Sequence, residues 1–153
     1  MGSDLLWNRR FIDHRVTFHL TLEYDLIVPR SLADFVKEAL ETVPEVTPQQ
    51  TALMAAGGEW TILDVREPEE YAEGHIQGSI NVPRGFLEVK ADLEHSKRDP
   101  RLANRSQKIV CYCGGGNRSA LAAKTLLEMG FEQVVSMAGG WRDWSGLNLP
   151  VSK

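Results

Sequence analysis

The residues best suited to chemistry form one short segment, Cys113-Gly114-Gly115-Gly116-Asn117-Arg118. It follows a continuous apolar run at residues 108–112, which predicts a buried parallel strand, and it precedes a predicted helix that begins near Arg118. Open α/β folds place their functional sites at this carboxyl edge of the sheet. A thiol there could act as a nucleophile, provided that its surroundings favour the thiolate.

The glycines and the helix of this loop are the features that would favour a thiolate. Three consecutive glycines let the chain turn tightly with its N–H groups pointing inward, and the helix adds the partial positive charge of its N-terminus. These groups should lower the pKa of Cys113 below the ordinary value of about 8.5, and they could hold a bound anion or an anionic persulfide. Asn117 tolerates unusual backbone angles, and Arg118 is the only cationic side chain of the loop. The alternative is a loop that only turns the chain, with a buried cysteine.

The second cysteine, Cys111, lies inside the predicted strand and should pack in the core, alternating with Tyr112. A resolving thiol for Cys113 is the alternative, although a disulfide across one intervening residue would be strained. Two cysteines with no nearby histidine make a poor zinc site, and they are not the framework of a disulfide-stabilised secreted protein. The sequence therefore predicts a reducing cytoplasm with one or both thiols free, without a metal or an organic cofactor.

Composition argues against several other classes of protein. The 153 residues are 42% hydrophobic and 25% charged, as in one soluble globular domain with its own core. A net charge of -4 gives no footprint for nucleic acid or an anionic membrane surface. No apolar run approaches the ~20 residues that span a bilayer, and the polar first ten residues do not resemble a secretory signal. The chain has no Gly-x4-Gly-Lys-Ser/Thr phosphate-binding motif.

Strands and helices alternate through the larger part of the chain, residues 45–153, which predicts an α/β domain with a parallel sheet. Strands are expected at residues 61–65, 79–82, 108–112 and 133–137. Helices are expected at residues 47–57, 67–72, 86–95 and 118–129, and Gly139-Gly140-Trp141 should open a last short helix. The helix at 86–95 is expected to place Phe86, Val89 and Leu93 on one side.

Residues 1–44 do not follow that rhythm and are predicted to be an N-terminal extension. Residues 16–22 alternate between apolar and polar side chains, which predicts a half-buried strand. Ser31 can cap a helix whose apolar residues recur at helical spacing, from Leu32 to Val43. The strand and helix could pack on the main domain, pair with a second copy in a homodimer, or dock a partner, and all three alternatives stay open.

Together with the cysteine loop, two other segments resemble the rhodanese family. Residues 63–71 (LDVREPEEY) and 74–83 (GHIQGSINVP) are similar to the signature LDVRxxxEYxxGHIxGAxNIP, and residues 138–141 (AGGW) resemble the C-terminal GG segment. The resemblance covers about residues 46–144. It implies a rhodanese-like fold, a five-stranded parallel sheet with helices on both faces, and it leaves the strand-helix extension outside.

The same resemblance implies sulfur transfer. Cys113 would take a sulfane sulfur from thiosulfate or a protein persulfide and pass it to cyanide or to a thiol acceptor such as a thioredoxin-like protein. Backbone N–H groups of Gly114, Gly115, Gly116, Asn117 and Arg118 would hold the persulfide. Because the loop carries one cation, we expect weak affinity for the thiosulfate dianion and a different physiological donor.

Asp64, Arg66 and His75 also match family positions. A Cys-His-Asp relay is one interpretation, but a thiolate that the loop already favours needs no general base. We therefore predict that Asp64 accepts hydrogen bonds from neighbouring loops, that Arg66 forms an ion pair, and that His75 binds backbone.

Three alternatives to a sulfurtransferase remain beside the resemblance. A non-catalytic interaction module with the rhodanese fold is the first, and the presence of Cys113 argues against it. A redox sensor that uses Cys111 and Cys113 is the second. The third is a phosphatase or arsenate reductase. It is disfavoured because four residues separate Cys113 from Arg118, whereas the related phosphatases use Cys-x5-Arg.

Overall fold

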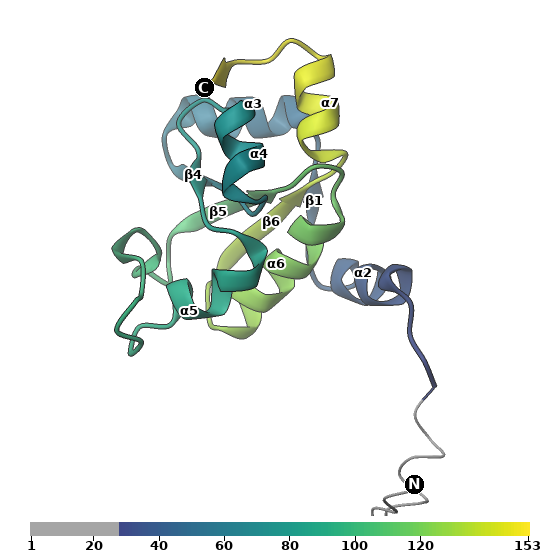
Figure 1. The fold of residues 1–153 in the computed structure, drawn as a ribbon, viewed down its shortest axis with the longest axis vertical. Coiled ribbons are helices and arrows are strands. Elements are labelled where there is room, and N and C mark those ends of the chain that lie inside the picture. The colour runs from purple at the N-terminus through teal and green to yellow at the C-terminus, as the bar shows by residue number, and fades with distance from the viewer. Residues whose placement is uncertain (1–27) are drawn as a thin grey trace, which may run out of the picture. The chain divides into compact units, whose positions relative to one another are not determined.

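A parallel five-stranded sheet forms the centre of the described part of the chain. The computed structural model describes residues 28–153, of which Leu32–Lys153 form one compact unit. The strand order is β1, β6, β5, β2, β4, and every neighbouring pair is parallel (Figure 1). The strands are β1 (Glu45–Val46), β2 (Trp60–Asp64), β4 (Ile80–Asn81), β5 (Lys108–Tyr112) and β6 (Gln133–Met137). The predicted α/β fold is confirmed.

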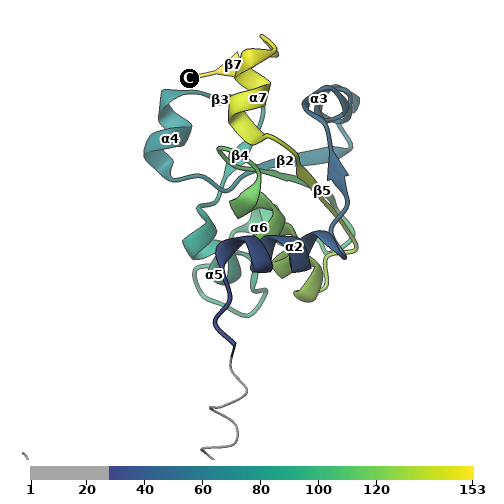
Figure 2. The ribbon, with the colours of Figure 1, turned by 90° about the vertical axis from the view of Figure 1, so that its right-hand side faces the viewer.

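Helices cover both faces of this sheet, and the central strand β5 is buried on both sides. One face carries α2 (Leu32–Leu40), α5 (Leu87–Ala91) and α6 (Asn117–Glu128), and the other carries α3 (Pro48–Gly57) and α7 (Gly140–Gly146) (Figure 2). Ile109 and Cys111 point into the core beneath α6, whereas Val110 and Tyr112 point into the core beneath α3 and α7. Two buried faces are the reason that β5 reads as a continuous apolar run.

The remaining elements are short. They are α4 (Pro68–Glu73), the 3-10 turns Arg84–Phe86 and Pro100–Leu102, and the antiparallel pair β3 (His75–Ile76) and β7 (Val151–Ser152). Local sequence explains the well-predicted helix ends. Thr47 and Gln50 cap α3 reciprocally, and Gly58, with φ of 74°, ends it. Gly130 follows α6 with φ of 91°, as predicted.

The helix predicted at residues 86–95 is shorter than expected. After the 3-10 turn, α5 spans Leu87–Ala91, and those two end residues are the buried ones. Phe86 and Leu93 are instead 60% and 43% exposed. In so short a segment two sets of apolar residues share helical spacing, and contact with α6 selects the pair that is buried.

The helix predicted after Ser31 is present as α2 and packs on α6. Its Ala39 is buried, as is Val43 just beyond the helix, and an ion pair joins Glu38 to Lys124 of α6. Leu32 and Phe35 of the same apolar stripe are 56% and 46% exposed. The strand predicted at residues 16–22 lies outside the described residues, and the division of the chain at residue 44 stays a prediction. None of the helices in residues 28–153 is long and apolar enough to cross a membrane.

Candidate active site

The loop between β5 and α6 wraps the sulfur of Cys113 in backbone N–H groups. The Gly116 amide donates to Sγ at 3.1 Å, and the amides of Gly115 and Ser119 also face the sulfur. Gly116 caps α6 with φ of 108°, a conformation that only glycine adopts readily. Asn117 was predicted to tolerate unusual backbone angles, but it is the first residue of α6, and the unusual angle falls on Gly116 instead.

Two buried serines that the sequence did not single out continue this network. The Cys113 sulfur lies 3.6 Å from Ser119 Oγ, which donates to the Gly116 carbonyl at 2.9 Å. Ser136 of β6 donates in turn to Ser119 Oγ at 3.0 Å. Ser119, in the first turn of the helix behind the cysteine, could have been noticed from the sequence. Ser136 could not, because it lies 17 residues away on a neighbouring strand.

Hydrogen bonds to the sulfur outweigh burial in setting the pKa of Cys113. Cys113 is 1% exposed, and burial alone would raise its pKa because a buried charge loses its hydration. Once Cys113 is ionised, the Ser119 hydroxyl can turn its single proton from the Gly116 carbonyl to the sulfur. That hydrogen bond and those from the amides of Ser119, Gly115 and Gly116 act in the opposite direction and leave the pKa of Cys113 below its ordinary value. The loop therefore favours the thiolate, the nucleophilic form of cysteine.

Cys111 is equally buried but lacks these donors. Burial, followed by the nearby charge of Cys113, raises the pKa of Cys111 far above its ordinary range. Both cysteines are free thiols, and both lie in the core beneath α6. The placement of Cys111 within the core agrees with its interpretation as a packing residue.

Arg118 is held in an ion pair that the sequence analysis missed. Its two terminal nitrogens donate to the two carboxylate oxygens of Glu70 on α4, at 2.7 and 2.9 Å. The hydrogen bond from Arg118 lowers the pKa of Glu70 to about 2. The loop's one cation therefore faces a carboxylate. The sequence held a weak signal for this pair, because Glu70 belongs to the EPEEY segment, but 48 residues separate the two partners.

Asp64 and Arg66 form a second, fully buried ion pair. Arg66 Nε contacts both oxygens of Asp64 at 3.1 and 3.0 Å, and one terminal nitrogen lies 2.7 Å from Oδ2. The same nitrogen donates to the Gly74 carbonyl at 2.7 Å, and the guanidinium stacks over Trp141 at 4.8 Å. The contacts join the end of β2 to the segment after α4 and to α7, as expected for residues that fix loops around the site.

His75 binds backbone, as predicted. Its Nδ1 lies 3.0 Å from the Tyr71 carbonyl, and its ring stacks on the Tyr71 ring with centroids 3.7 Å apart. The hydrogen bonds found for Asp64, Arg66 and His75 within the described part of the chain go to these loops and not to the sulfur. The geometry thus supports positioning roles for the three residues and gives no support to a Cys-His-Asp relay.

The first turn of α7 closes over the cysteine loop from the other side. The Trp141 amide donates to the Cys113 carbonyl at 2.7 Å, and the Arg142 amide donates to the Gly114 carbonyl at 3.1 Å. Gly140 makes this approach possible. With φ of 60°, an added Cβ would collide with the Cys113 carbonyl oxygen and lie 2.7 Å from the Gly114 carbonyl carbon.

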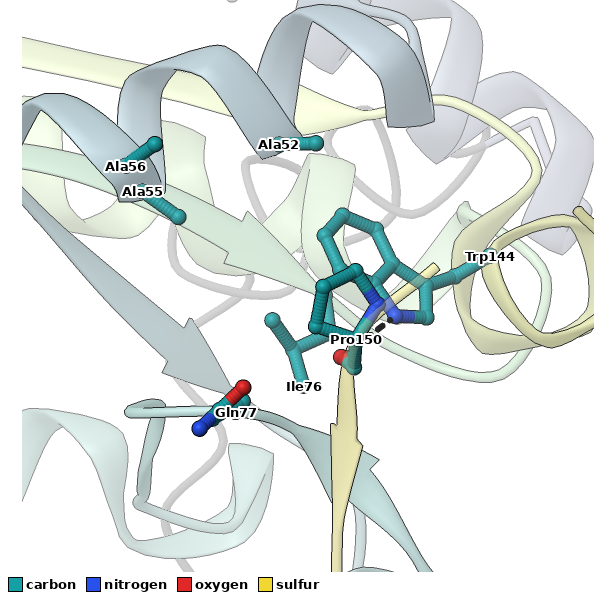
Figure 3. A pocket seen from close by; sticks show the side chains of 7 residues that line it. All are labelled: Ala52, Ala55, Ala56, Ile76, Gln77, Trp144 and Pro150. Carbon is teal, nitrogen blue, oxygen red and sulfur yellow. Dashed lines mark hydrogen bonds between the residues drawn. The ribbon is translucent and has the colours of Figure 1, made fainter. Parts of the chain in front are cut away.

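A separate cavity of about 270 Å³ lies beside α3 and α7. Figure 3 shows alanines of α3 on one side of it and Trp144, Ile76 and Pro150 on the other. Its lining contains no titratable side chain and no residue of the cysteine loop, so it offers no nucleophile. Residues 28–153 contain no group of three or more His, Cys, Asp or Glu side chains placed to hold a metal ion.

Comparison with known proteins identifies the family. The Rhodanese-like domain family matches residues 47–147, the segment that contains the loop, α4 and α7. The chain belongs to the rhodanese-like family. The match agrees with the resemblance carried by the three sequence segments, and it leaves α2 and the residues before it outside the family domain.

The relatives of this rhodanese-like protein include a thiosulfate sulfurtransferase and a protein described as a putative sulfur carrier. Thiosulfate sulfurtransferase 16 of Arabidopsis thaliana chloroplasts is 36% identical over 102 residues, which are 65% of this chain and 83% of the relative. YrkF of Bacillus subtilis is 39% identical over 85 residues, 56% of this chain, and the matched part is only 41% of YrkF.

A solved structure shares the fold. It is a protein from Rhodopseudomonas palustris described as having unknown function and as a possible tyrosine phosphatase. It is 32% identical, with a TM-score of 0.77 over 82% of this chain and 97% of the neighbour. Taken together, the relatives support general sulfur transfer as the activity of the family to which the chain belongs.

Proposed function

We propose that this rhodanese-like chain is a sulfurtransferase that carries a sulfane sulfur on Cys113 as a persulfide. The observation that carries the proposal is the sulfur cradle, in which backbone amides and the Ser119 hydroxyl converge on Cys113 and lower its pKa. A cradle of amides at a buried sulfur stabilises an anion whether the charge sits on the thiolate or on the persulfide.

The first half of the reaction loads the sulfur. The Cys113 thiolate attacks the outer sulfur of the donor and forms a new sulfur–sulfur bond, while the donor's own sulfur–sulfur bond breaks. The leaving group takes the electron pair of the broken bond, as sulfite from thiosulfate or as a thiolate from a persulfide. One sulfur–sulfur bond forms as another breaks, and the transferred sulfur keeps its oxidation state, so no oxidant or reductant is needed.

The second half of the reaction unloads the sulfur. A thiolate acceptor, or cyanide in an assay, attacks the outer sulfur of the Cys113 persulfide, and Cys113 departs with the electron pair. A thiol of low pKa is a better leaving group. The hydrogen bonds from Ser119 and Gly116 therefore assist both halves, first by populating the nucleophile and then by stabilising it as it leaves.

Positioning is the role that we propose for the surrounding residues. Asp64 and Arg66 hold the segment after α4 and the first turn of α7 in place, and His75 orients that segment through Tyr71. A small sulfur-containing anion or a protein persulfide would be the donor, and a thiol would be the acceptor. A reducing compartment such as the cytoplasm would keep both cysteines available as thiols.

The proposal is tested by intact-protein mass spectrometry after exposure to thiosulfate and, separately, to cysteine persulfide. Wild-type protein should gain about 32 Da per transferred sulfur. Cyanide should remove the added mass. Cys113→Ser should not gain the removable sulfur, whereas the matched variant Cys111→Ala should gain it as wild type does. The proposal would be overturned if wild-type protein loads sulfur from neither donor, or if Cys113→Ser still gains a sulfur that cyanide removes.

Phosphatase activity is suggested by the description of the Rhodopseudomonas palustris neighbour, and the site of this chain does not favour it. Only four residues separate Cys113 from Arg118. Glu70 occupies both terminal nitrogens of Arg118, the groups that would otherwise bind a phosphate. Hydrolysis of p-nitrophenyl phosphate, measured on wild type and Cys113→Ser, should remain at the background rate for both proteins.

A further inference from the structure

The Glu70–Arg118 pair lies directly against the first residue of the sulfur loop. A Cβ built on Gly114 would be 3.3 Å from a terminal nitrogen of Arg118 and 3.9 Å from Oε1 of Glu70. Both side chains are 38% exposed, so the pair stands between solvent and the loop rather than inside the core. A small donor that approaches Gly114 from solvent therefore meets the carboxylate as well as the guanidinium.

Glu70 is fixed in this position by two independent groups. Arg118 contributes the two-pronged ion pair, and the Glu67 amide donates to Oε2 of Glu70 at 3.0 Å as part of the capping box of α4. With its pKa lowered by the Arg118 hydrogen bond, the carboxylate stays ionised throughout the physiological range. The negative charge beside the loop is thus permanent and held in one orientation.

The other arginines of the elements around the loop are also matched by carboxylates. Arg66 is 3% exposed and bound to Asp64, and Arg142 is bound to the neighbouring Asp143. The site is consequently rich in N–H donors from the backbone but poor in net positive charge. Amide donors can hold a single charge on sulfur, whereas a dianion also needs neutralising cations at its second charge.

We propose that Glu70 is a specificity-determining residue, whose carboxylate occupies Arg118 and disfavours dianionic donors such as thiosulfate relative to thiol persulfides. The inference rests on the proposed function, because it presupposes that Cys113 accepts a sulfur. With thiosulfate, the Cys113 thiolate takes the outer sulfur and sulfite leaves with two negative charges. With a persulfide, the outer sulfur moves to Cys113 in the same way and a thiolate leaves with one.

The test compares two donors on Glu70→Gln, which removes the charge and keeps the amide oxygen that can accept from Glu67. The rate of Cys113 loading is measured by quenched mass spectrometry, with thiosulfate and with cysteine persulfide in separate reactions. With thiosulfate, kcat/KM should rise about tenfold at low ionic strength, mainly through KM, because a freed guanidinium attracts the dianion. The rise should shrink as salt is added. Loading by cysteine persulfide should change by less than about twofold, because that donor carries one net negative charge and does not need the guanidinium for a second.

Three control variants separate the charge of Glu70 from its shape. Glu69→Gln removes the same charge from an adjacent, exposed position of α4 and should leave the thiosulfate rate near that of wild type. Glu70→Asp keeps the carboxylate and should keep thiosulfate loading slow. In the double variant Glu70→Gln/Arg118→Gln the gain should disappear, because no guanidinium remains to be freed.

Several results would overturn the inference. One is an unchanged thiosulfate rate in Glu70→Gln. Another is a parallel rise or fall for both donors, which would indicate a general structural role. Persistence of the gain without Arg118 is a third. These outcomes differ from failure of the proposed function, in which Cys113 of wild type loads from neither donor and both proposals fall together.

Discussion

Cys111 and Cys113 are two residues apart, lie in the same core and are almost completely buried, yet their thiols have opposite acidities. Cys111, within β5, is 0% exposed, and Cys113, just beyond the strand, is 1% exposed. Burial raises the pKa of Cys111, whereas the pKa of Cys113 is lowered despite burial. The difference comes from their partners. The strand commits the backbone amides around Cys111 to β2 and β6, whereas the loop aims its amides at the sulfur of Cys113.

The comparison shows that exclusion from solvent does not decide the reactivity of a cysteine in this fold. Leaving the ladder of the sheet frees backbone donors, and the glycines permit those donors to converge on one atom. Cys111 in the strand is therefore a packing residue, whereas Cys113 in the loop just beyond it is a candidate nucleophile. The predictions below alter one part of this contrast at a time.

Alkylation should show the largest difference between the two cysteines. At pH 7 iodoacetamide should modify native Cys113 faster than Cys111 by on the order of a hundredfold or more, because the thiolate is the reactive form. Peptide mass spectrometry would assign the sites, and in denaturant the two rates should become similar. Equal rates in the native protein would contradict the interpretation of the cradle.

Gly140→Ala should give the next largest effect, because it disrupts the packing of the first turn of α7 on the loop that holds Cys113. The added methyl would collide with the backbone of Cys113 and Gly114 at a positive φ, so the variant should lose about 2–4 kcal/mol of unfolding free energy. Urea denaturation measures the loss. Gly146→Ala, in the last turn of the same helix with no atom within 4 Å of its Cβ, should change stability by less than about 0.5 kcal/mol. A similar loss of unfolding free energy in both variants would indicate a general effect of replacing a glycine in α7 and not an effect of the contact with the loop.

Ser119→Ala should make Cys113 more like Cys111. The Ser119 hydroxyl favours the thiolate, so its removal should raise the pKa of Cys113 and shift the pH profile of alkylation upward. At pH 7 less thiolate remains, and the rate should fall several-fold. Ser136→Ala acts one hydrogen bond further away and should shift the profile in the same direction by less. An unchanged profile in Ser119→Ala would assign the lowered pKa to the backbone amides alone.

Cys111→Ala should have the smallest effect on the site. Cys111 stays a neutral thiol because its pKa is raised, so its loss should leave the alkylation profile of Cys113 where it is. The small cavity should cost about 1 kcal/mol of stability. A displaced profile would show that Cys111 takes part in the chemistry, as the redox-sensor alternative requires.

The five-residue strands β5 and β6 were predictable from the sequence, whereas three of the two-residue strands were not. The strands β5 and β6 have the predicted ends because an apolar run bounded by polar residues is itself the signal. β1, β3 and β7 have two residues each and exist because a partner strand is alongside. The burial of Leu87 and Ala91 in α5 was not predicted for a related reason, since its packing partner α6 lies far along the chain.

By itself, the sequence determined the family, the sheet and the place of Cys113, because strand, glycine loop and helix are contiguous and their local preferences agree. Tertiary structure decided the charge of the site. Ser136 reaches Ser119 across 17 residues, and Glu70 reaches Arg118 across 48. Pairings of this kind depend on which elements the fold brings side by side, and no local pattern encodes them. From the sequence, the loop was expected to offer backbone amides and the positive charge of Arg118. In the structure the amides surround the sulfur, but the charge of Arg118 is neutralised by Glu70.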